Sequence, residues 1–506
     1  MQTTALRYQK TIMTKRLQAP LLGVIAIGLI TAVSCNKDND TPATPGNTVE
    51  LKAYSTTPSL VMPMPGVSGL DIYPLISSED HLPGSPSFIY GAQPDGGGLI
   101  KNPDGKGYIL INNHEILFSV SRVYLDETFK PIKGEYIVDA VGGAMRLCSA
   151  TMATQEINGF GPVFLTAGET SQESMVHAIN PLGSVADRQR NDRTLPALGK
   201  ANMENAVPLP KQAYPGKTLI FIGEDQSYTA SHQSAGQLLM YMSGIVGDLQ
   251  TGELYALKRT SGDQVEMNMN KGSQYDVEFV KLPNIKSKTG AEINTIVNGL
   301  GAIRFSRVED VDYRKGSAAN NREIYFTATG QAVGGTTPEP GYTMWGRVYK
   351  LVLDANDPTK GKLQVIAEGD SKPGMDLINP DNICVTDNYV YIQEDGDSYY
   401  AAAQHDSYIW QYNMSTGEYK PWITPNHNRT DAAWNTRFNT VNENRKGSWE
   451  WGAMYDISDV IGVPNTFLLN IHPHTWQSNA FSNADGSGLN TNKEGGQTLI
   501  IRGVNK

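Results

Sequence analysis

The sequence is poor in cysteine and histidine, with three and eight of these residues among 506. So few cysteines exclude a disulfide-dense scaffold, and the scarcity of both residue types argues against a structural zinc site. The sequence also lacks a Gly-x-Ser-x-Gly turn, a P-loop and a His-Glu-x-x-His motif. Serine-hydrolase, P-loop nucleotide-binding and zincin interpretations therefore have no support.

Charged residues are also scarce, at 19% of the sequence. Near the N-terminus, four basic residues precede an apolar run over residues 21–33, which is too short to span a membrane as a mature helix. We expect residues 1–34 to be a cleaved secretion signal. Its removal takes away four basic and no acidic residues and moves the formal net charge from −10 to −14. Nucleic acid is therefore not an expected partner.

The end of the predicted signal resembles the lipobox of bacterial lipoproteins. It reads Ala-Val-Ser-Cys and ends at Cys35, which we expect to be the lipidated first residue of the mature chain. The segment Asn36–Asp40 is similar to the Lys-acidic tag that exports such lipoproteins to the cell surface. Residues 35–57 are expected to be a flexible tether. The sequence thus predicts an outer-membrane lipoprotein on the cell surface, which touches the membrane only through its lipid.

The remaining sequence is rich in glycine (50), proline (28) and tyrosine (24). This composition is typical of short strands separated by turns, so we predict an all-β fold. An apolar run that ends in polar residues recurs six times. The copies begin at Tyr108, Pro162, Thr218, Glu323, Tyr389 and Thr466.

Successive copies start 54, 56, 105, 66 and 77 residues apart, and several are followed by a second, alternating strand and a turn. A loose repeat of this kind is typical of β-propeller blades. The sequence therefore predicts a single domain over residues 58–506, a six-bladed β-propeller with loop insertions. We interpret the apolar runs as the innermost strands, and expect Thr498–Val504 to pair with Ser59–Pro63 and close the ring.

Polar residues at the ends of innermost strands would meet in the central channel. Most of the candidates are carboxylates, which suit calcium or another hard cation. They are Glu115, Glu169, Glu204, Glu224, Asp225, Glu309, Asp310, Asp381, Glu394, Asp395 and Glu450.

Two cysteines remain after lipidation. Cys148 precedes the second apolar run, and it is either a thiolate ligand, which would suit iron better than calcium, or a small buried core residue. Cys384 lies between Ile383 and Val385 and is expected in the core. A disulfide between the two cysteines is the third alternative.

An arginine stands next to one candidate ligand. Arg307 and Glu309 lie two residues apart, and in an extended segment they share one face. A guanidinium beside a metal-binding carboxylate can hold a phosphate, because it matches the phosphate oxygens while metal ions neutralise the remaining charge.

Taken in order, these motifs resemble those of the PhoX-type alkaline phosphatases, a family of secreted bacterial phosphomonoesterases. The resemblance covers roughly residues 95–476, most of the mature chain. The matching segments are Asn113-His114-Glu115, Cys148 with the strand that ends at Glu169, Glu204, Gly223-Glu224-Asp225, Arg307-Val308-Glu309, Pro380-Asp381-Asn382, Glu394-Asp395-Gly396, and Glu450 followed by Asn470-Ile471-His472.

The resemblance implies a six-bladed propeller with calcium and iron in its channel, acting on a small-molecule phosphate ester. Separately, we expect the protein to be a monomer. Arg307 would be the catalytic phosphate-binding residue, and Asn113 a further substrate contact. The implied iron ligands are Cys148, Glu204, Glu309 and Asp381. The implied calcium ligands are Glu115, Glu169, Glu394 and Asp395.

Two other functions remain open. A calcium-dependent lactonase or esterase on a similar propeller would need neither the thiolate nor the arginine. A surface-tethered binding protein with a degenerate metal site is the third alternative, because Met203 and Val308 depart from the family's motifs.

Overall fold

The computed structural model describes residues 48–226, 236–333, 337–338, 340–395 and 402–506. The chain divides into two units, Met1–Gly46 and Asn47–Lys506, and the strands and helices of the described residues belong to the second. The predicted secretion signal and the lipidation site at Cys35 lie outside the described residues. Within the described part of the chain, no helix is both long and apolar enough to cross a lipid bilayer.

Antiparallel sheets form most of the second unit. One four-stranded sheet contains, in order, β3 (Pro94–Lys101), β4 (Tyr108–His114), β5 (Ser119–Leu125) and β6 (Pro131–Val138). A three-stranded sheet contains β7 (Leu147–Ala153), β8 (Val163–Gly168) and β9 (His177–Ile179). A second four-stranded sheet contains β2 (Asp71–Ser77), β27 (Gln497–Arg502), β26 (Thr466–His472) and β25 (Glu450–Asp456).

The other sheets differ in size. A five-stranded sheet contains β1 (Val61–Pro63), β24 (Tyr419–Pro425), β23 (Ile409–Asn413), β22 (Tyr389–Glu394) and β21 (Pro380–Val385). A nine-stranded sheet contains β10 (Met203–Pro208), β11 (Thr218–Glu224), β12 (Gln237–Ser243), β13 (Glu253–Arg259), β14 (Gln274–Lys281), β20 (Lys360–Glu368), β19 (Arg347–Leu353), β16 (Glu323–Ala328) and β15 (Val308–Tyr313). A short pair contains β17 (Ala332–Val333) and β18 (Thr337–Pro338).

Helices are short and lie between strands. The α-helices are α1 (Ala140–Gly143), α2 (Gly290–Gly299), α3 (Ala432–Phe438) and α4 (Ser458–Ile461). The 3-10 helices are η1 (Glu115–Leu117), η2 (Val185–Asp187), η3 (Pro196–Leu198), η4 (Glu266–Asn268), η5 (Ile285–Ser287), η6 (Asn320–Arg322) and η7 (Asn479–Phe481).

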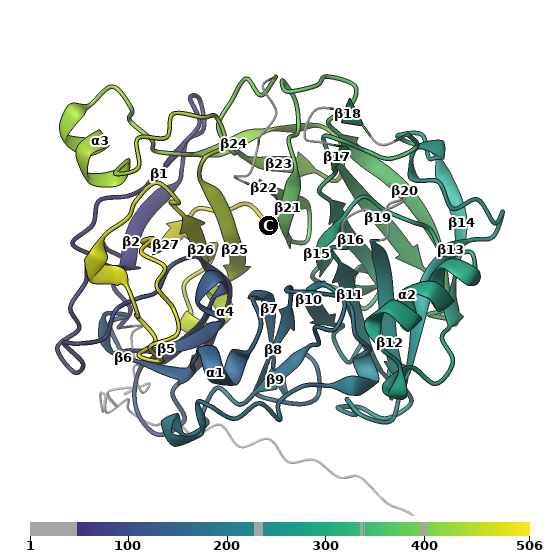
Figure 1. Ribbon diagram of the computed structural model, residues 1–506, viewed down its shortest axis with the longest axis horizontal. Coiled ribbons are helices and arrows are strands. Elements are labelled where there is room, and N and C mark those ends of the chain that lie inside the picture. Colours follow the sequence, from purple (N-terminus) through teal and green to yellow (C-terminus); the bar gives the residue numbers. More distant parts are fainter. Residues whose placement is uncertain (1–47, 227–235, 334–336, 339, 396–401) are drawn as a thin grey trace, which may run out of the picture. The chain divides into compact units, whose positions relative to one another are not determined.

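The sheets are arranged around a common centre in the manner of a propeller. Strands β3, β7, β10, β15, β21 and β25 contact one another in that order, and β25 contacts β3 again. In Figure 1, the labels of β7, β10, β15, β21 and β25 stand around the centre of the view. The nine-stranded sheet contains two of them, because β14 and β20 pair along its middle. The prediction of a mainly β protein with propeller-like sheets is therefore confirmed.

The assignment of the innermost strands was wrong by one strand. The repeated apolar runs are β4, β8, β11, β16, β22 and β26, each of which is the second strand from the centre. Strand β11 shows why these runs are so apolar. Leu219 and Phe221 pack into one hydrophobic core, and Ile220 and Ile222 pack into the next. A strand buried on both faces reads as a continuous apolar run, whereas the inner strands carry polar residues.

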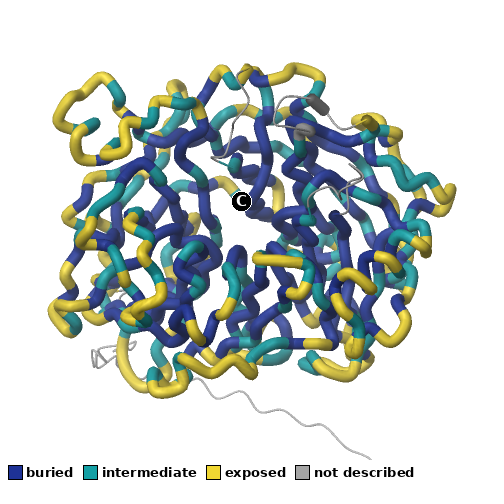
Figure 2. The backbone as a smooth tube through the Cα atoms, in the orientation of Figure 1, coloured by how far each residue is buried: buried dark blue, intermediate teal, exposed yellow. Residues whose placement is uncertain are grey.

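Burial follows the same arrangement. Figure 2 shows the buried backbone concentrated toward the inner and middle strands, while the exposed segments are mostly loops at the periphery. The hydrophobic cores therefore lie between neighbouring sheets, and polar side chains that are buried near the centre need partners there.

Each inner strand has a β-bulge after its first paired residues. In β3, for example, the pairing with β4 skips from Pro94 to Gly97. A bulge bends the strand and redirects a side chain. The residues inside the six bulges are Asp95-Gly96, Cys148-Ser149, Glu204-Asn205, Glu309-Asp310, Asp381-Asn382 and Gly452-Ala453.

The ends of the described chain meet in the sheets, but not as we predicted. Strand β27 pairs with β2, from Asp71 opposite Arg502 to Ser77 opposite Gln497. The three-residue strand β1 instead pairs with β24. The predicted pairing of Thr498–Val504 with Ser59–Pro63 was therefore wrong, because the longer strand β2 occupies that edge.

Residues 48–57, which we assigned to the tether, lie against the domain. The amide of Glu50 donates to the carbonyl of Thr128 at 3.0 Å, and the amide of Tyr54 donates to that of Pro74 at 2.9 Å. The side chains of Leu51 and Tyr54 pack on the hydrophobic core beside β2.

Candidate metal centre

Seven side chains that could ligate metal ions form a chain of neighbouring groups at the start of the inner strands. They make three groups, and within each group one ligand atom per residue lies within 4.8 Å of the others. Cys148 and Glu204 each belong to two groups and so connect them. The groups are Asp95, Glu115 and Cys148; Cys148, Glu169 and Glu204; and Glu204, Glu309 and Asp381.

The bulges explain why these residues meet. Asp95, Cys148, Glu204, Glu309 and Asp381 are each the second residue of an inner strand. Each lies in the bulge of its strand, which turns that side chain toward the others. The two remaining members follow neighbouring strands, Glu115 after β4 and Glu169 after β8.

Burial and mutual repulsion dominate the electrostatics of this cluster. Burial, together with Glu115, Asp310 and Asp225, raises the pKa of Glu204 to about 8. The pKa values of Asp95 and Asp381 are also raised, first by burial and then by neighbouring carboxylates. The Oδ1 atoms of Asp95 and Asp381 are buried and have no hydrogen-bond partner among the described residues. Such a set is costly unless cations balance it.

The thiol of Cys148 belongs to the same cluster. Its Sγ donates to Oε2 of Glu169 at 3.3 Å. Burial, followed by Glu204, Glu115 and Glu169, raises the pKa of this thiol, so a thiolate needs a cation beside it. Cys148 and Cys384 are both free and buried. The alternative of a disulfide between them was therefore wrong.

Arg307 lies beside the cluster and reaches solvent, with a quarter of its side chain exposed. Its Nε donates to Oδ1 of Asp225 at 2.7 Å, and its Nη2 donates to Oε1 of Glu309 at 2.6 Å. The backbone of Arg307 has a positive φ of 65°, a conformation that residues other than glycine rarely adopt. Burial lowers the pKa of Arg307, but Asp225 and Glu309 outweigh it and raise the pKa.

A second arginine, Arg146, stands on the other side of the cluster with 40% of its side chain exposed. Its Nη1 lies 3.0 Å from Oε1 of Glu115 and 3.7 Å from Oε2 of Glu169. Both arginines thus form ion pairs with carboxylates of the cluster, and both side chains are partly exposed to solvent.

Asn113 and Asp395 are predicted site residues that lie outside the three groups described above. The amide of Asn113 is fully buried and donates to the carbonyl of Cys148 and to Oγ1 of Thr166, so it supports strand β7. Asp395 Oδ2 lies 4.0 Å from Nη1 of Arg307, at the edge of the cluster.

The structure does not bring Glu394 to the cluster. Its Oε1 accepts from the amide of Ile378 and from Nε1 of Trp410, both at 2.7 Å. Its Oε2 accepts from the amide of Tyr408 at 2.6 Å. These partners occupy both oxygens, so we leave Glu394 out of the centre proposed below.

Sequence reasoning missed Asp95, although a signal was present. The dipeptide Pro94-Asp95 begins β3 just as Pro380-Asp381 begins β21. We also did not propose His472 and His474, which gather with Glu450 beside the cluster.

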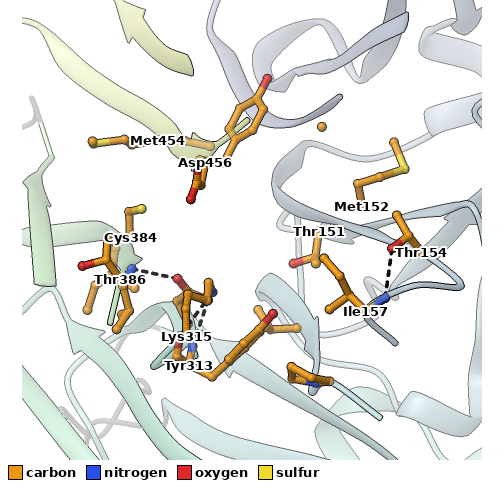
Figure 3. Close-up of a pocket in the computed structure, with 18 of the residues that line it drawn as sticks. Thr151, Met152, Thr154, Ile157, Tyr313, Lys315, Cys384, Thr386, Met454 and Asp456 are labelled. Atoms are coloured by element: carbon orange, nitrogen blue, oxygen red, sulfur yellow. Dashed lines mark hydrogen bonds and ion pairs between the residues drawn. The ribbon is translucent and has the colours of Figure 1, made fainter. Parts of the chain in front are cut away.

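A pocket of about 690 Å³ opens at the opposite ends of the inner strands. In Figure 3, Thr151 and Met152 of β7 face Tyr313 of β15 and Cys384 of β21 across it. Among the predicted ligands, Asp310 lines this pocket, whereas none of the seven residues of the three groups does.

One hydrogen bond lies between the pocket and the cluster. Nδ2 of Asn382 donates to Oγ of Ser149 at 2.6 Å. Because β21 and β7 stand on opposite sides of the ring of inner strands, this bond crosses the channel.

Comparison with known proteins identifies a similar fold. No protein-family model matches the sequence, and no curated protein does. The solved structure of Pseudomonas fluorescens PhoX in complex with vanadate, a transition-state analogue, matches with a TM-score of 0.57 and 13% identity, over 90% of this chain and 99% of that one. At this identity the likeness establishes the fold alone.

Two further solved structures match with lower TM-scores. An α-L-arabinofuranosidase from Fusarium graminearum, in complex with an iminosugar inhibitor, has a TM-score of 0.36 and 12% identity, over 83% of this chain and 96% of its own. A PQQ-bound aldose sugar dehydrogenase from Streptomyces coelicolor has a TM-score of 0.33 and 10% identity, over 86% of this chain and 98% of its own.

Proposed function

We propose that this chain is a metal-dependent phosphatase of the PhoX type, which hydrolyses small phosphate esters at a calcium and iron centre in a six-bladed propeller. One observation carries the proposal: the partly exposed guanidinium of Arg307 lies directly beside a buried cluster of carboxylates and one thiol. Positive charge fixed next to metal ligands is what phosphoryl transfer requires. The PhoX fold likeness is consistent with it.

The residues present fit the proposed metal ions. The donors are carboxylate oxygens with one sulfur, a set that suits hard cations and, at the sulfur, iron. The partnerless Oδ1 atoms of Asp95 and Asp381 are what a missing cation would leave behind. We propose Cys148, Glu204, Glu309 and Asp381 as iron ligands, and Glu115, Glu169 and Asp395 as calcium ligands, with Asp95 as an addition from the structure.

When bound, the cations would supply Lewis acidity and neutralise charge on the phosphoryl group. Arg307 would bind the phosphoryl oxygens through Nη1, which lies 4.0 Å from Asp395, and stabilise the charge that grows in the transition state. Asp225 and Glu309 fix the direction of this guanidinium, so little reorganisation is needed. We further propose that the protein is a monomer tethered to the outer membrane through lipid on Cys35.

The decisive experiment combines elemental analysis with activity. Purified protein offered calcium and iron is expected to retain both metals and to hydrolyse a chromogenic phosphomonoester at alkaline pH, with loss of activity after chelation. Protein that binds neither metal and shows no hydrolysis would overturn the proposal. Hydrolysis of lactones that survives Cys148→Ala and Arg307→Ala would instead favour the lactonase alternative.

A conservative variant tests the role of Arg307. Arg307→Lys keeps the charge but loses the planar fork that contacts Asp225 and Glu309, so we expect kcat/KM for the phosphomonoester to fall at least about 100-fold. Arg502→Lys, on the exposed end of β27, is the matched control and should be unchanged. Equal activity of the two variants would contradict a phosphate-binding role for Arg307.

A further inference from the structure

Glu450, His472 and His474 form a group of different chemistry beside the carboxylate cluster. Glu450 begins β25, and His472 ends β26 directly opposite it in the sheet. Oε2 of Glu450 lies 3.5 Å from Nδ1 of His472 and 2.9 Å from Nε2 of His474. Ligand atoms around a tetrahedral zinc ion with bonds near 2.0–2.1 Å are about 3.3 Å apart. The three atoms thus have the spacing of metal ligands.

The outer nitrogen of each histidine is held by an acceptor. Nε2 of His472 lies 3.0 Å from the carbonyl oxygen of Pro94, and Nδ1 of His474 lies 3.0 Å from Oε2 of Glu494. Nε2 of Gln93 donates to the same oxygen of Glu494 at 2.7 Å. Metal-binding histidines have this arrangement, because the outer hydrogen bond fixes the tautomer and turns the other nitrogen toward the metal.

An ion pair without any metal would explain the contacts of His474 but not those of His472. His474 could bridge Glu450 and Glu494 as an imidazolium without any metal. His472 is different, because its side chain is 0% exposed and its Nδ1 has no hydrogen-bond partner among the described residues. A buried ring nitrogen that points at a carboxylate without bonding to it needs a further partner.

We propose that Glu450, His472 and His474 bind a divalent transition-metal ion of the zinc and ferrous-iron class. Two imidazole nitrogens and one carboxylate are the donors such ions prefer, whereas calcium prefers oxygen alone. Oε2 of Glu115 lies 4.0 Å from Nδ1 of His472, so Glu115 is placed to join this site to the carboxylate and thiol cluster. The site adds a nitrogen-ligated ion to the proposed calcium and iron centre.

The test is zinc binding by the chelator-treated full-length protein. In Cys148→Ser protein, which removes the competing thiolate, X-ray absorption at the zinc edge should show outer-shell scattering from two imidazoles. His474→Gln should weaken zinc binding at least about 100-fold in calorimetry and abolish half of that scattering. His81→Gln, at an exposed histidine, is the matched control and should bind zinc as the parent does. Zinc bound without imidazole scattering would overturn the proposal.

A second variant keeps the test decisive if His474→Gln does not fold. Glu494→Gln leaves the three ligands in place and alters only the outer acceptor of His474, so zinc affinity should fall about 10–100-fold. Unchanged affinity would count against the site. Phosphatase activity is a separate readout. A protein that binds zinc through imidazoles but has no phosphatase activity would contradict the proposed function and support this inference.

Discussion

At the residue scale, consecutive acidic residues have divergent roles. The sequence contains the pairs Glu224-Asp225, Glu309-Asp310 and Glu394-Asp395. Glu309 belongs to the carboxylate and thiol cluster, while its neighbour Asp310 accepts from Nδ2 of Asn205 and from the amide of Ile383. Asp395 lies near Arg307, while Glu394 is bound inside the sheet.

Asp225 is expected to act on the reaction through Arg307. Asp225→Asn removes the charge that holds Nε of Arg307, so the guanidinium loses its fixed direction and kcat/KM for a phosphomonoester should fall about 10–100-fold. The control is Asp192→Asn, which disrupts a similar but exposed pair with Arg190 and should leave the kinetics unchanged. Kinetics that do not distinguish the two variants would show that Asp225 has no positioning role.

Sequence patterns could locate these acidic pairs but could not predict which residue of each pair faces the centre. Successive side chains of a strand point to opposite faces, so a pair offers one residue to each side. Which residue faces the centre depends on the bulge and the register, and neither is visible in a single sequence. The structure places Asp381 and Glu309 in one cluster, whereas Glu394 lies outside it.

Glu266 is expected to make stability depend on pH. Its Oε1 accepts from Tyr349 and its Oε2 from the amide of Ser306, next to Arg307. Burial raises the pKa of Glu266 to about 7, although Arg347 and Tyr349 lower it. The folded protein therefore binds this proton more tightly than the unfolded chain, and stability should fall by about 3 kcal/mol as pH rises from about 4.5 to about 7.

The variant Glu266→Gln tests this expectation, because an amide resembles the protonated acid and cannot ionise. Urea unfolding at several pH values between about 4.5 and about 8 should show a shallower decline of stability for the variant than for the parent. Parallel curves would mean that Glu266 is ionised throughout this range in the folded protein.

At the element scale, the close approach of β11 to the bulge of β15 controls the position of Glu309. A Cβ added to Gly223 of β11 would lie 1.9 Å from the carbonyl oxygen of Glu309. Gly223→Ala must therefore push the two strands apart, and we expect a loss of about 1–3 kcal/mol in the free energy of unfolding. Iron bound per chain should fall as well, because Glu309 is displaced.

The matched control is Gly244→Ala. A Cβ at Gly244 meets nothing within 4 Å, and its backbone does not have a positive φ. This variant should keep the stability and metal content of the parent. If Gly223→Ala changes neither the free energy of unfolding nor the iron content, the bulge of β15 tolerates displacement.

The elements themselves were predictable to different degrees. The second strands were found because they are buried on both faces and read as apolar runs. The inner strands escaped notice because Pro94, Gly96 and Gly97 of β3 are typical of a turn rather than a strand. Their strand structure comes from the neighbouring sheets, which are distant in sequence.

At the scale of the whole molecule, stability depends on closing the ring of sheets. Strands β2 and β27 are about 430 residues apart, from Tyr73 to its partner Ile500, and their pairing joins the two ends of the described domain. Ile500 is fully buried. Ile500→Ala should cost about 2–5 kcal/mol in the free energy of unfolding. Urea unfolding measures this loss.

The control is Leu489→Ala, at a side chain that is 67% exposed, and it should be nearly neutral. Fluorescence and activity should be lost together in Ile500→Ala if the ring unfolds as one unit. Separate transitions would show that the sheets unfold independently. The repeat in the sequence predicted a closed ring, but the choice of β2 over β1 depended on strand length and edge position.

The hydrogen bond between Asn382 and Ser149 crosses the channel between the carboxylate and thiol cluster and the pocket on the far side. A molecule that enters beside Arg307 and Arg146 would meet this hydrogen bond before the pocket, so we expect it to leave by the way it came. For the proposed hydrolysis, substrate would then enter and inorganic phosphate would leave by the same route. Inorganic phosphate must therefore leave before the next substrate molecule can bind, and phosphate competes directly with substrate.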